Sequence, residues 1–229
     1  MRVGIIVAMS KELELLKPML ENLRVSDNNG IKFYCGTIGN HKIAAMHCGV
    51  GKVNAAIGTV TMIDTYNPEL IINTGVAGGV NKEVNVMDMV VGSQVCYHDV
   101  WCGGFDDNAS YGQVQGLPLY FEGASKLISM IENYENVHCG LIVSGDQFIN
   151  TMEQIDTIKE HFPQALAVDM ESGAIAHACY VMKTPFLSMR VISDSPGAGH
   201  DNSKQYSDFW VDAPAHTLAM VKELLHKLN

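Results

Sequence analysis

The sequence ALAVDMESGAIAHA, residues 165–178, changes from a short apolar run to small residues at helical spacing. The apolar run is typical of a buried parallel strand, and the small residues after it predict a helix. Asp169, Met170 and Glu171 lie at the change. In open α/β sheets, ligands bind outside the carboxyl ends of the strands, where the next helix presents unpaired N–H groups. The stretch therefore predicts an α/β fold with a ligand site beside Glu171.

The carboxylate of Glu171 has two interpretations at this point. The helix dipole favours its ionised form, and an ionised carboxylate accepts two hydrogen bonds at once, which suits the vicinal hydroxyls of a ribose. An acidic residue in the first turn of a helix also stabilises that helix without binding any ligand. The identity of this residue alone does not distinguish a ribose-binding role from a helix-stabilising role.

The composition is typical of one globular α/β domain. The chain has 229 residues, of which 47% are hydrophobic and 17% are charged, so it is long enough to bury a substantial core. We expect a single domain over residues 1–229. The apolar run from Val3 to Met9 is too short to cross a bilayer, and Arg2 before it lacks the pattern of a signal peptide. We therefore expect no membrane partner.

Cysteine, histidine and charge patterns argue against several other classes of protein. The six cysteines form no C-x-x-C pair, which argues against a zinc site or a disulfide framework and favours the reducing cytoplasm. The nine histidines show no paired ligand spacing, so we expect no metal and no cofactor. A net charge of −10 argues against a nucleic-acid partner, because phosphate contacts need clustered Lys and Arg.

Strands and helices alternate along the rest of the chain. Apolar runs predict strands at residues 3–9, 32–38, 42–47, 70–73, 89–95, 137–143 and 186–192. A first helix is predicted to begin after Ser10, which would be its N-cap. Further helices are predicted at residues 52–66, 122–134, 151–161 and 206–228. Three further loops follow predicted strands: TGVAGG at 74–79, SGDQFIN at 144–150 and SDSPGAGHDN from 193. These loops are predicted to form the site.

Two glycine-rich motifs do not match nucleotide-binding patterns. GVGKV at residues 49–53 has the Lys of a phosphate-binding loop but lacks the earlier glycine and the Ser or Thr after the Lys. GVAGG at residues 75–79 lacks the G-x-G-x-x-G spacing and gives only weak support for a dinucleotide site.

An ordered set of short strings resembles one family. GIIVAMSKE, CGVGKVNAA, IINTGVAGG, YHD, GLIVSGDQFIN, AVDME and RVISD occur in the order and spacing of the bacterial 5′-methylthioadenosine/S-adenosylhomocysteine nucleosidases, within the nucleoside phosphorylase superfamily. The resemblance covers most of the chain and is weakest at residues 100–135 and after Ser195. It implies a single-domain, three-layer α/β/α fold with a central mixed, twisted sheet.

The resemblance implies hydrolysis of the N-ribosidic bond of these nucleosides, with release of adenine and the 5′-thioribose product. It assigns Asp194 as the acid that protonates the purine and Glu12 as the residue that activates water, while Arg190 and Glu171 shape the water and ribose site. Phe148 is expected to stack on adenine. The other implied substrate contacts are Met9, Val50, Val76, Ala77, Gly78, Ile149, Met170 and Ser193.

This chemistry places a demand on Asp194. Breaking a C–N bond to a purine passes through an oxocarbenium-like centre, and the departing base must be protonated. An ordinary Asp has a pKa of about 3.9, so the site must keep a proton on Asp194 through desolvation or through hydrogen bonds. A loop Asp that caps a turn is the alternative interpretation of the SDSPG string.

The chain departs from the family pattern at two places. Many members have Ser where this chain has Val76, and SDSPGAGHDN differs from the usual small residues after the Ser-Asp pair. Three alternatives therefore stay open: a purine nucleoside phosphorylase, an aminofutalosine hydrolase and a non-catalytic nucleoside sensor on the same fold. Glu12 disfavours the phosphorylase, because a carboxylate there repels phosphate.

The irregular stretch from Tyr97 to Pro118 predicts a homodimer. Its apolar residues would otherwise lie exposed, and such surface commonly marks an interface. The resemblance also implies a two-fold dimer in which Phe105, Leu117 and Pro118 reach towards the partner's site. The alternative is a lid that folds over its own chain.

Overall fold

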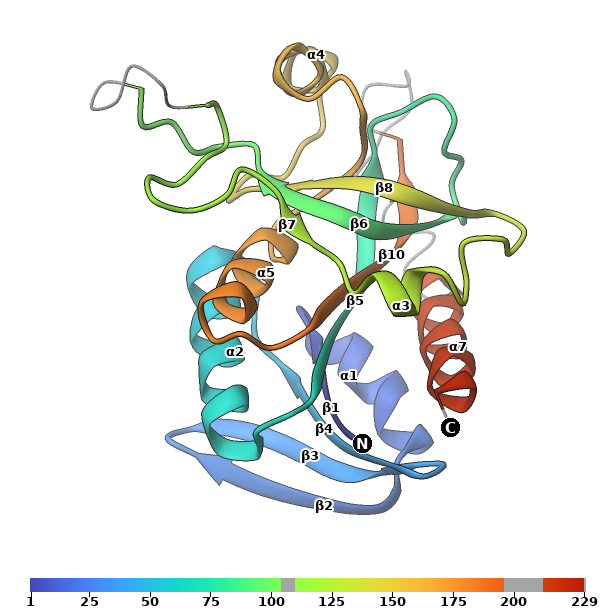
Figure 1. Ribbon diagram of the computed structural model, residues 1–229. Helices are drawn as coiled ribbons and strands as arrows, with labels where there is room; N and C mark the ends of the chain where they lie inside the picture. The colour runs from blue at the N-terminus through green and yellow to red at the C-terminus, as the bar shows by residue number, and fades with distance from the viewer. Residues whose placement is uncertain (104–109, 196–211, 229) are drawn as a thin grey trace.

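The computed structural model describes residues 1–103, 110–195 and 212–228, without the side chains of residues 212–214. The described strands are β1 Arg2–Val7, β2 Glu21–Asn28, β3 Ile31–Ile38, β4 His41–His47, β5 Leu70–Gly79, β6 Met89–Tyr97, β7 Phe121–Glu122, β8 Val137–Ser144, β9 Ala165–Asp169 and β10 Phe186–Asp194 (Figure 1). The helices are α1 Ser10–Leu16, α2 Lys52–Tyr66, α3 Ser125–Ile128, α4 Met152–His161, α5 Ser172–Val181 and α7 Asp212–Lys227, with a 3₁₀ turn at Lys17–Met19.

All ten described strands belong to one mixed sheet. β1 lies between β4 and β5 and is parallel to both, and β2 and β3 extend the sheet as antiparallel neighbours beyond β4. At the other end, β5, β9, β8, β6 and β10 pair in turn, and β10 pairs back with β5. These five strands close into a ring. The predicted mixed, twisted sheet of the nucleoside phosphorylase type is therefore confirmed.

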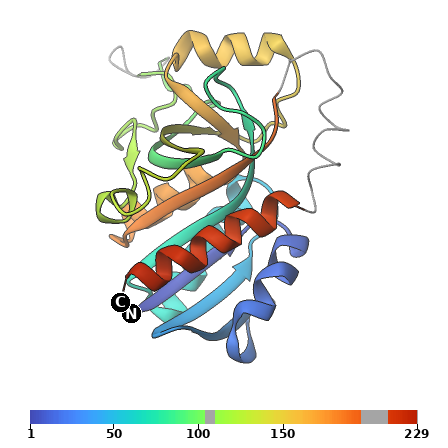
Figure 2. The same cartoon turned by 90° about the vertical axis from the view of Figure 1, so that its right-hand side faces the viewer.

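Helices cover the sheet in separate layers. Helices α1 and α7 bury Leu13, Leu16, Val221 and Leu224 against one face, and Figure 2 shows α7 lying along the sheet beside α1. Helices α2 and α5 bury another set against the opposite face, with Met62, Ala174, Ile175 and Cys179 among them. The prediction of a three-layer α/β/α fold is confirmed.

The small residues of α5 explain how closely this helix packs. A Cβ atom at Gly173 would lie 2.8 Å from Tyr97 Cε1 and 2.9 Å from Ser144 Cβ, so only glycine fits between β6 and β8 here. Ala174, Ile175 and Ala176 are also buried. The strand-to-helix change predicted at residues 169–171 is confirmed, since β9 ends at Asp169 and α5 begins at Ser172.

Two predicted loops are strands in the structure. β5 continues through TGVAGG to Gly79, because Gly75 to Gly78 pair with β10 on one side and Gly78 and Gly79 pair with β9 on the other. β10 likewise continues through Ser193 and Asp194. Pairing partners that are distant in the sequence turned glycine-rich segments into strands, although glycine alone weakens a strand.

The helix predicted at residues 122–134 is confirmed only at Ser125–Ile128. Glu122 belongs to β7, which pairs with β6, and a Cβ atom at Gly123 would lie 2.2 Å from the carbonyl oxygen of Gly92. α3 is only Ser125–Ile128, and i→i+3 hydrogen bonds such as Met130 N–H to Leu127 O continue the chain as turns. Pairing with β6 thus removes the first residue of the predicted helix, and turns replace its last residues.

Two smaller predictions also need correction. β2 was not predicted, because most of its residues are exposed and show no apolar alternation. Ser10 is the first residue of α1 and not its N-cap, which is Met9. The strands predicted at residues 32–38 and 42–47 are confirmed as β3 and β4, which form an antiparallel pair on either side of Gly39 and Asn40.

Candidate active site

One pocket lies where the carboxyl ends of β1, β5, β9 and β10 meet. β5 and β9 are antiparallel but pair only near their carboxyl ends, where Gly78 lies opposite Val168. The pocket encloses about 600 Å³, including its opening to solvent, which is the size of a small-molecule site. Its lining includes all the residues predicted as catalytic or substrate-binding: Met9, Glu12, Val50, Val76, Ala77, Gly78, Phe148, Ile149, Met170, Glu171, Arg190, Ser193 and Asp194.

Glu12 is held in the first turn of α1 by backbone groups. Its Oε2 accepts hydrogen bonds from the N–H groups of Ala8 (3.1 Å) and Met9 (3.0 Å), and the residue is 2% exposed. Burial raises the pKa of Glu12, against the lowering effects of Arg190 and of the backbone N–H groups. The carboxyl group therefore has a fixed orientation and an affinity for a proton above the ordinary value.

Gly75 makes room for Glu12 and Arg190. A Cβ atom at this position would lie 2.7 Å from both Glu12 Oε1 and Arg190 Nη1. The backbone of β5 thus approaches two charged side chains too closely for any other residue. This close approach explains why the first residue of the GVAGG motif is glycine, and the explanation requires no bound nucleotide.

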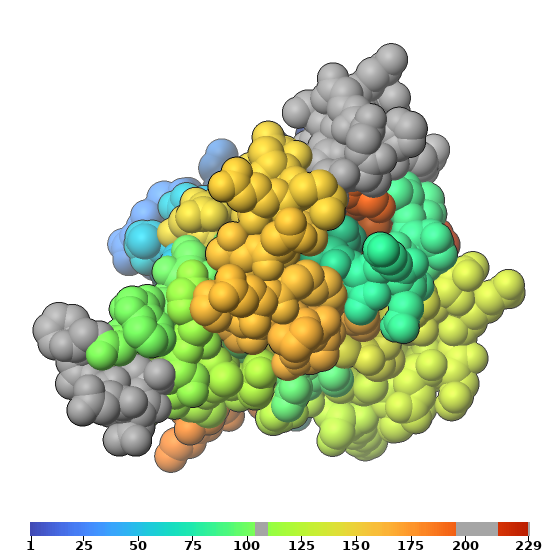
Figure 3. All heavy atoms as spheres, turned by 90° about the horizontal axis from the view of Figure 1, so that it is seen from above, coloured from blue at the N-terminus to red at the C-terminus, as the bar shows by residue number. Residues whose placement is uncertain are grey.

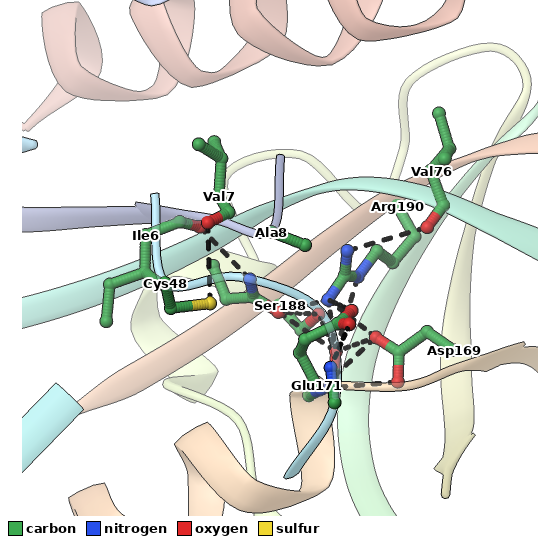
Figure 4. A network of polar contacts seen from close by, with 12 residues as sticks. Ile6, Val7, Ala8, Cys48, Val76, Asp169, Glu171, Ser188 and Arg190 are labelled. Carbon is green, nitrogen blue, oxygen red and sulfur yellow. Dashed lines mark hydrogen bonds and ion pairs between the residues drawn. The ribbon is translucent and has the colours of Figure 1, made fainter. Parts of the chain in front are cut away.

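Arg190 is the centre of a buried polar network (Figure 4). Its Nη2 lies 2.6 Å from Asp169 Oδ2 and 3.8 Å from Glu171 Oε2, and it donates to Asn73 Oδ1 at 2.6 Å. Its Nη1 donates to the carbonyl oxygen of Val76 at 3.5 Å. A buried guanidinium needs such partners, because an unpaired buried charge is strongly destabilising.

Asp169 completes this network; the sequence placed it at the change from strand to helix beside the predicted site but assigned it no role. Its carboxylate pairs with Arg190 and accepts from the N–H and hydroxyl groups of Ser172, at the start of α5. Ser172 also contacts Ser188 through their hydroxyls at 2.7 Å. The signal for Asp169 was present in the sequence, because an arginine in an apolar strand requires a buried carboxylate near it.

Glu171 lies at the N-cap of α5 and is 5% exposed. Its Oε1 accepts a hydrogen bond from the N–H of Gly51 at 3.0 Å. Burial raises the pKa of Glu171 to about 7, the charge of Asp169 adds to this effect, and Arg190 opposes it. Desolvation thus opposes the helix dipole, which was expected to keep this carboxylate ionised, and a pKa of about 7 leaves the group only partly ionised near neutral pH.

Asp194 ends β10 and is 2% exposed. Its Oδ1 accepts a hydrogen bond from the hydroxyl of Ser193 at 2.7 Å, and that hydroxyl also lies 3.3 Å from the carbonyl oxygen of Ala77. Burial raises the pKa of Asp194, and the hydrogen bond from Ser193 opposes the rise. The direction is the one that a proton donor near neutral pH requires.

The loop after β8 forms another wall. Phe148 is 46% exposed, whereas Ile149 is buried in the cluster beneath α4. Gly145 N–H donates to the carbonyl oxygen of Asp169 at 3.1 Å, which ties this loop to the end of β9. Gln147 lines the pocket and was also missed by the sequence analysis, as were Ala8 and Val168. These three positions carry no residue type that distinguishes them from ordinary loop or core residues.

Of the predicted partner-loop residues that the structure describes, Leu117 and Pro118 do not line this pocket. Phe105 lies outside the described residues. Leu117 and Pro118 are partly buried, and Leu117 packs against the core cluster beneath α2 and α5. Nearby, Tyr111 stacks on His161 of α4 with ring centroids 3.7 Å apart. Figure 3 shows α4 in gold on this face, with the green segment around residues 110–120 beside it.

Acidic side chains outnumber basic ones in the pocket. Among the described lining residues, four carboxyl groups (Glu12, Asp169, Glu171 and Asp194) accompany one cation, Arg190. The described residues contain no group of His, Cys, Asp and Glu arranged to hold a metal ion. Within the same part of the chain, no helix is long and apolar enough to cross a membrane.

Comparisons with known proteins agree with the sequence resemblance. The Phosphorylase superfamily matches residues 2–226. A 5′-methylthioadenosine/S-adenosylhomocysteine nucleosidase of Exiguobacterium is 41% identical, and the match covers 100% of this chain and 99% of that protein.

Two solved nucleosidase structures are also similar. The enzyme of Streptococcus pneumoniae with the transition-state inhibitor MT-ImmA is 34% identical, with a TM-score of 0.95 and full coverage of both chains. That of Colwellia psychrerythraea in complex with adenine is 32% identical, with a TM-score of 0.93 over 100% of this chain and 96% of the other. Because similarity of this extent covers the whole chain, the protein belongs to the 5′-methylthioadenosine/S-adenosylhomocysteine nucleosidase family of the phosphorylase superfamily.

Proposed function

We propose that this protein hydrolyses the N-ribosidic bond of 5′-methylthioadenosine and S-adenosylhomocysteine and releases adenine. The observation that carries the proposal is the presence of Glu12, Glu171 and Asp194 in one pocket, each buried and each with a different hydrogen-bond environment. Carboxyl groups in different environments are able to take different roles in one reaction.

Asp194 is the proposed general acid. It donates a proton to the purine as the C–N bond breaks, so that adenine leaves as a neutral base. Burial raises its pKa, which keeps a fraction of the group protonated where an ordinary Asp would be fully ionised. Ser193 donates to Oδ1 and so fixes the orientation of the carboxyl group.

Glu12 is the proposed base that activates water. One of its oxygens is held by the N–H groups of Ala8 and Met9, while Oε1 lies on the side of Gly75 and Arg190. The carboxylates also suit the transition state, because the ribosyl centre becomes cationic as the bond breaks. A phosphate nucleophile would be repelled by the same charges.

Glu171 is the proposed partner of the ribose hydroxyls. Its Oε1 is held by Gly51 N–H, and the carboxyl group retains acceptor capacity for two vicinal hydroxyls. Met170 is expected to lie against the sugar, and Phe148 at the rim is expected to stack on adenine. Met9 and Val50 add apolar surface suited to a 5′-alkylthio group.

A nucleoside panel tests this function. Adenine release is measured from 5′-methylthioadenosine, S-adenosylhomocysteine, 5′-deoxyadenosine and aminofutalosine, each with and without inorganic phosphate. We expect the first two to be cleaved at a rate independent of phosphate, with the free thioribose as product. Formation of a ribose 1-phosphate would instead identify a phosphorylase, and absence of turnover with every nucleoside would favour a sensor.

We also propose that the protein is a homodimer. The neighbouring helices α2 and α5 expose large apolar side chains, namely Val53, Ile57, Val60, Tyr180 and Val181. A groove lined by Val53, Val60 and Val181 also includes Val100 and Val114 from the segment after β6. A continuous apolar surface of this kind is typical of an interface, and a two-fold axis would bury the same surface on both subunits. Val100 and Val114 would then lie beside the partner subunit.

A further inference from the structure

Two motifs in the sequence, YHD at 97–99 and GVGKV at 49–53, meet outside the pocket. Asp99 Oδ2 accepts hydrogen bonds from Lys52 Nζ at 2.7 Å and from the N–H of Asp146 at 2.9 Å. Asp146 Oδ1 in turn accepts from the N–H of Lys52 at 2.7 Å. These contacts close a ring that joins the end of β6, the start of α2 and the loop after β8. None of the three residues lines the pocket.

This ring is connected to the pocket on two sides. Gly51, which precedes Lys52, donates its N–H to Glu171 Oε1 at 3.0 Å. Asp146 precedes Gln147 and Phe148, which line the wall expected to face adenine. Any displacement of Lys52 therefore moves the donor that orients Glu171.

Two glycines show how tightly the ring is built. Gly51 has a φ of 94°, and a Cβ atom there would lie 2.9 Å from Asp146 Oδ1. A Cβ atom at Gly145 would lie 2.8 Å from Asp99 Cγ and 2.6 Å from His98 Nε2. The backbones on both sides thus approach the ring more closely than a side chain would permit.

The position of Asp99 also has an energetic cost. Its Oδ1 and the Nε2 of His98 are buried and have no hydrogen-bond partner among the described residues. A buried polar atom without a partner is destabilising and calls for an explanation other than stability. Ion pairs near the surface contribute little on average, and the side chains of Lys52 and Asp99 are 23% and 14% exposed.

We propose that Lys52 and Asp99 are positioning residues that hold the Gly51 N–H against Glu171 and thereby set the discrimination for the ribose hydroxyls. The proposal rests on the assignment of Glu171 to the ribose under Proposed function. It gives the Lys of GVGKV a task that involves no phosphate, since its ammonium group binds a carboxylate of the same chain.

The test compares 5′-methylthioadenosine with its 3′-deoxy analogue. The measured quantity is the ratio of their kcat/KM values in the wild type and in Lys52→Met, Asp99→Asn and the double variant. We expect each single variant to lower this ratio by roughly ten- to a hundredfold, the effect of one charge-assisted hydrogen bond. The double variant should lose no more than the single ones, because both break the same link. Lys52→Arg, which keeps the charge, should retain most of the ratio.

Controls separate positioning from a loss of folded protein. A variant that is merely less folded loses kcat/KM equally for both nucleosides, so an unchanged ratio in both single variants would overturn the proposal. Glu69→Gln, which removes the exposed partner of Arg2 far from the pocket, should keep both activity and ratio. Glu171→Gln should abolish the discrimination. If it does not, the ribose assignment itself fails, and the positioning role fails with it.

Discussion

Arg190 Nη2 lies 2.6 Å from Asp169 Oδ2, and the two side chains are 1% and 2% exposed. This ion pair joins β10 to the end of β9 in the wall of the pocket. Arg190 also donates a hydrogen bond to Asn73 and lies 3.8 Å from Glu171, so one guanidinium group interacts with several acceptors. The pocket retains an excess of acidic groups, which suits a reaction whose transition state is cationic.

Breaking this pair should destabilise the whole protein. Asp169→Asn leaves the Arg190 charge buried without its partner, and we expect a loss of about 3–5 kcal/mol in the free energy of unfolding. Urea denaturation measures this change in the free energy of unfolding. Glu69→Gln at the exposed pair with Arg2 is the matched control and should change stability far less. Equal effects of the two substitutions would show that burial does not decide the strength of these pairs.

Asp194→Asn should remove most of the turnover. The amide keeps the shape of the side chain but cannot deliver a proton, and general acid catalysis contributes about 10² to 10⁴ in rate. The dissociation constant of a non-hydrolysable substrate analogue, measured by calorimetry, should change little. Activity within a few-fold of the wild type would rule out Asp194 as the acid.

Glu12→Gln should reduce kcat by a similar factor of about 10² to 10⁴, because the amide cannot accept a proton from water. Inorganic phosphate should not restore the rate. Glu14→Gln, on the exposed side of the same helix, is the control and should retain wild-type kinetics. Rescue by phosphate, with formation of a sugar phosphate, would contradict the assignment of Glu12 to water activation.

Stability should fall as pH rises through the titration of Glu171. Burial raises the pKa of this group from 4.5 to about 7, so the folded protein binds more protons than the unfolded chain in that window. The free energy of unfolding then decreases with rising pH. Glu171→Gln should remove a slope of up to about 1.4 kcal/mol per pH unit between these values. Denaturation at several pH values measures the slope, and Glu83→Gln on the surface should leave it unchanged.

Val53→Arg combined with Val181→Arg should convert the proposed dimer into monomers, because two charges would be buried at the apolar surface of α2 and α5. Light scattering gives the mass, and adenine release gives the activity. Val25→Arg on β2 replaces a similarly exposed valine away from these helices and should leave the mass unchanged. A wild type that is monomeric and fully active at assay concentration would end the dimer hypothesis.

Local sequence patterns determined the fold class and most of the pocket. The apolar run and the small residues at 165–178 specify β9, α5 and the position of Glu171 between them, since hydrophobic period and residue size act over a few neighbours. The order of short strings around Glu12, Phe148, Arg190 and Asp194 identified the family, and these residues line one pocket.

Only the tertiary structure decided the course of β5 and the electrostatics of the site. TGVAGG is a strand because β9 and β10 pair with it from opposite sides, and these partners are about a hundred residues away in the sequence. The pKa of Glu171 rises because several segments exclude water from it, which opposes the helix dipole that the local sequence predicts. Asp169, Lys52 and Asp99 acquire their contacts in the same way, because ion pairing depends on distance in space, whereas local sequence patterns record only neighbours along the chain.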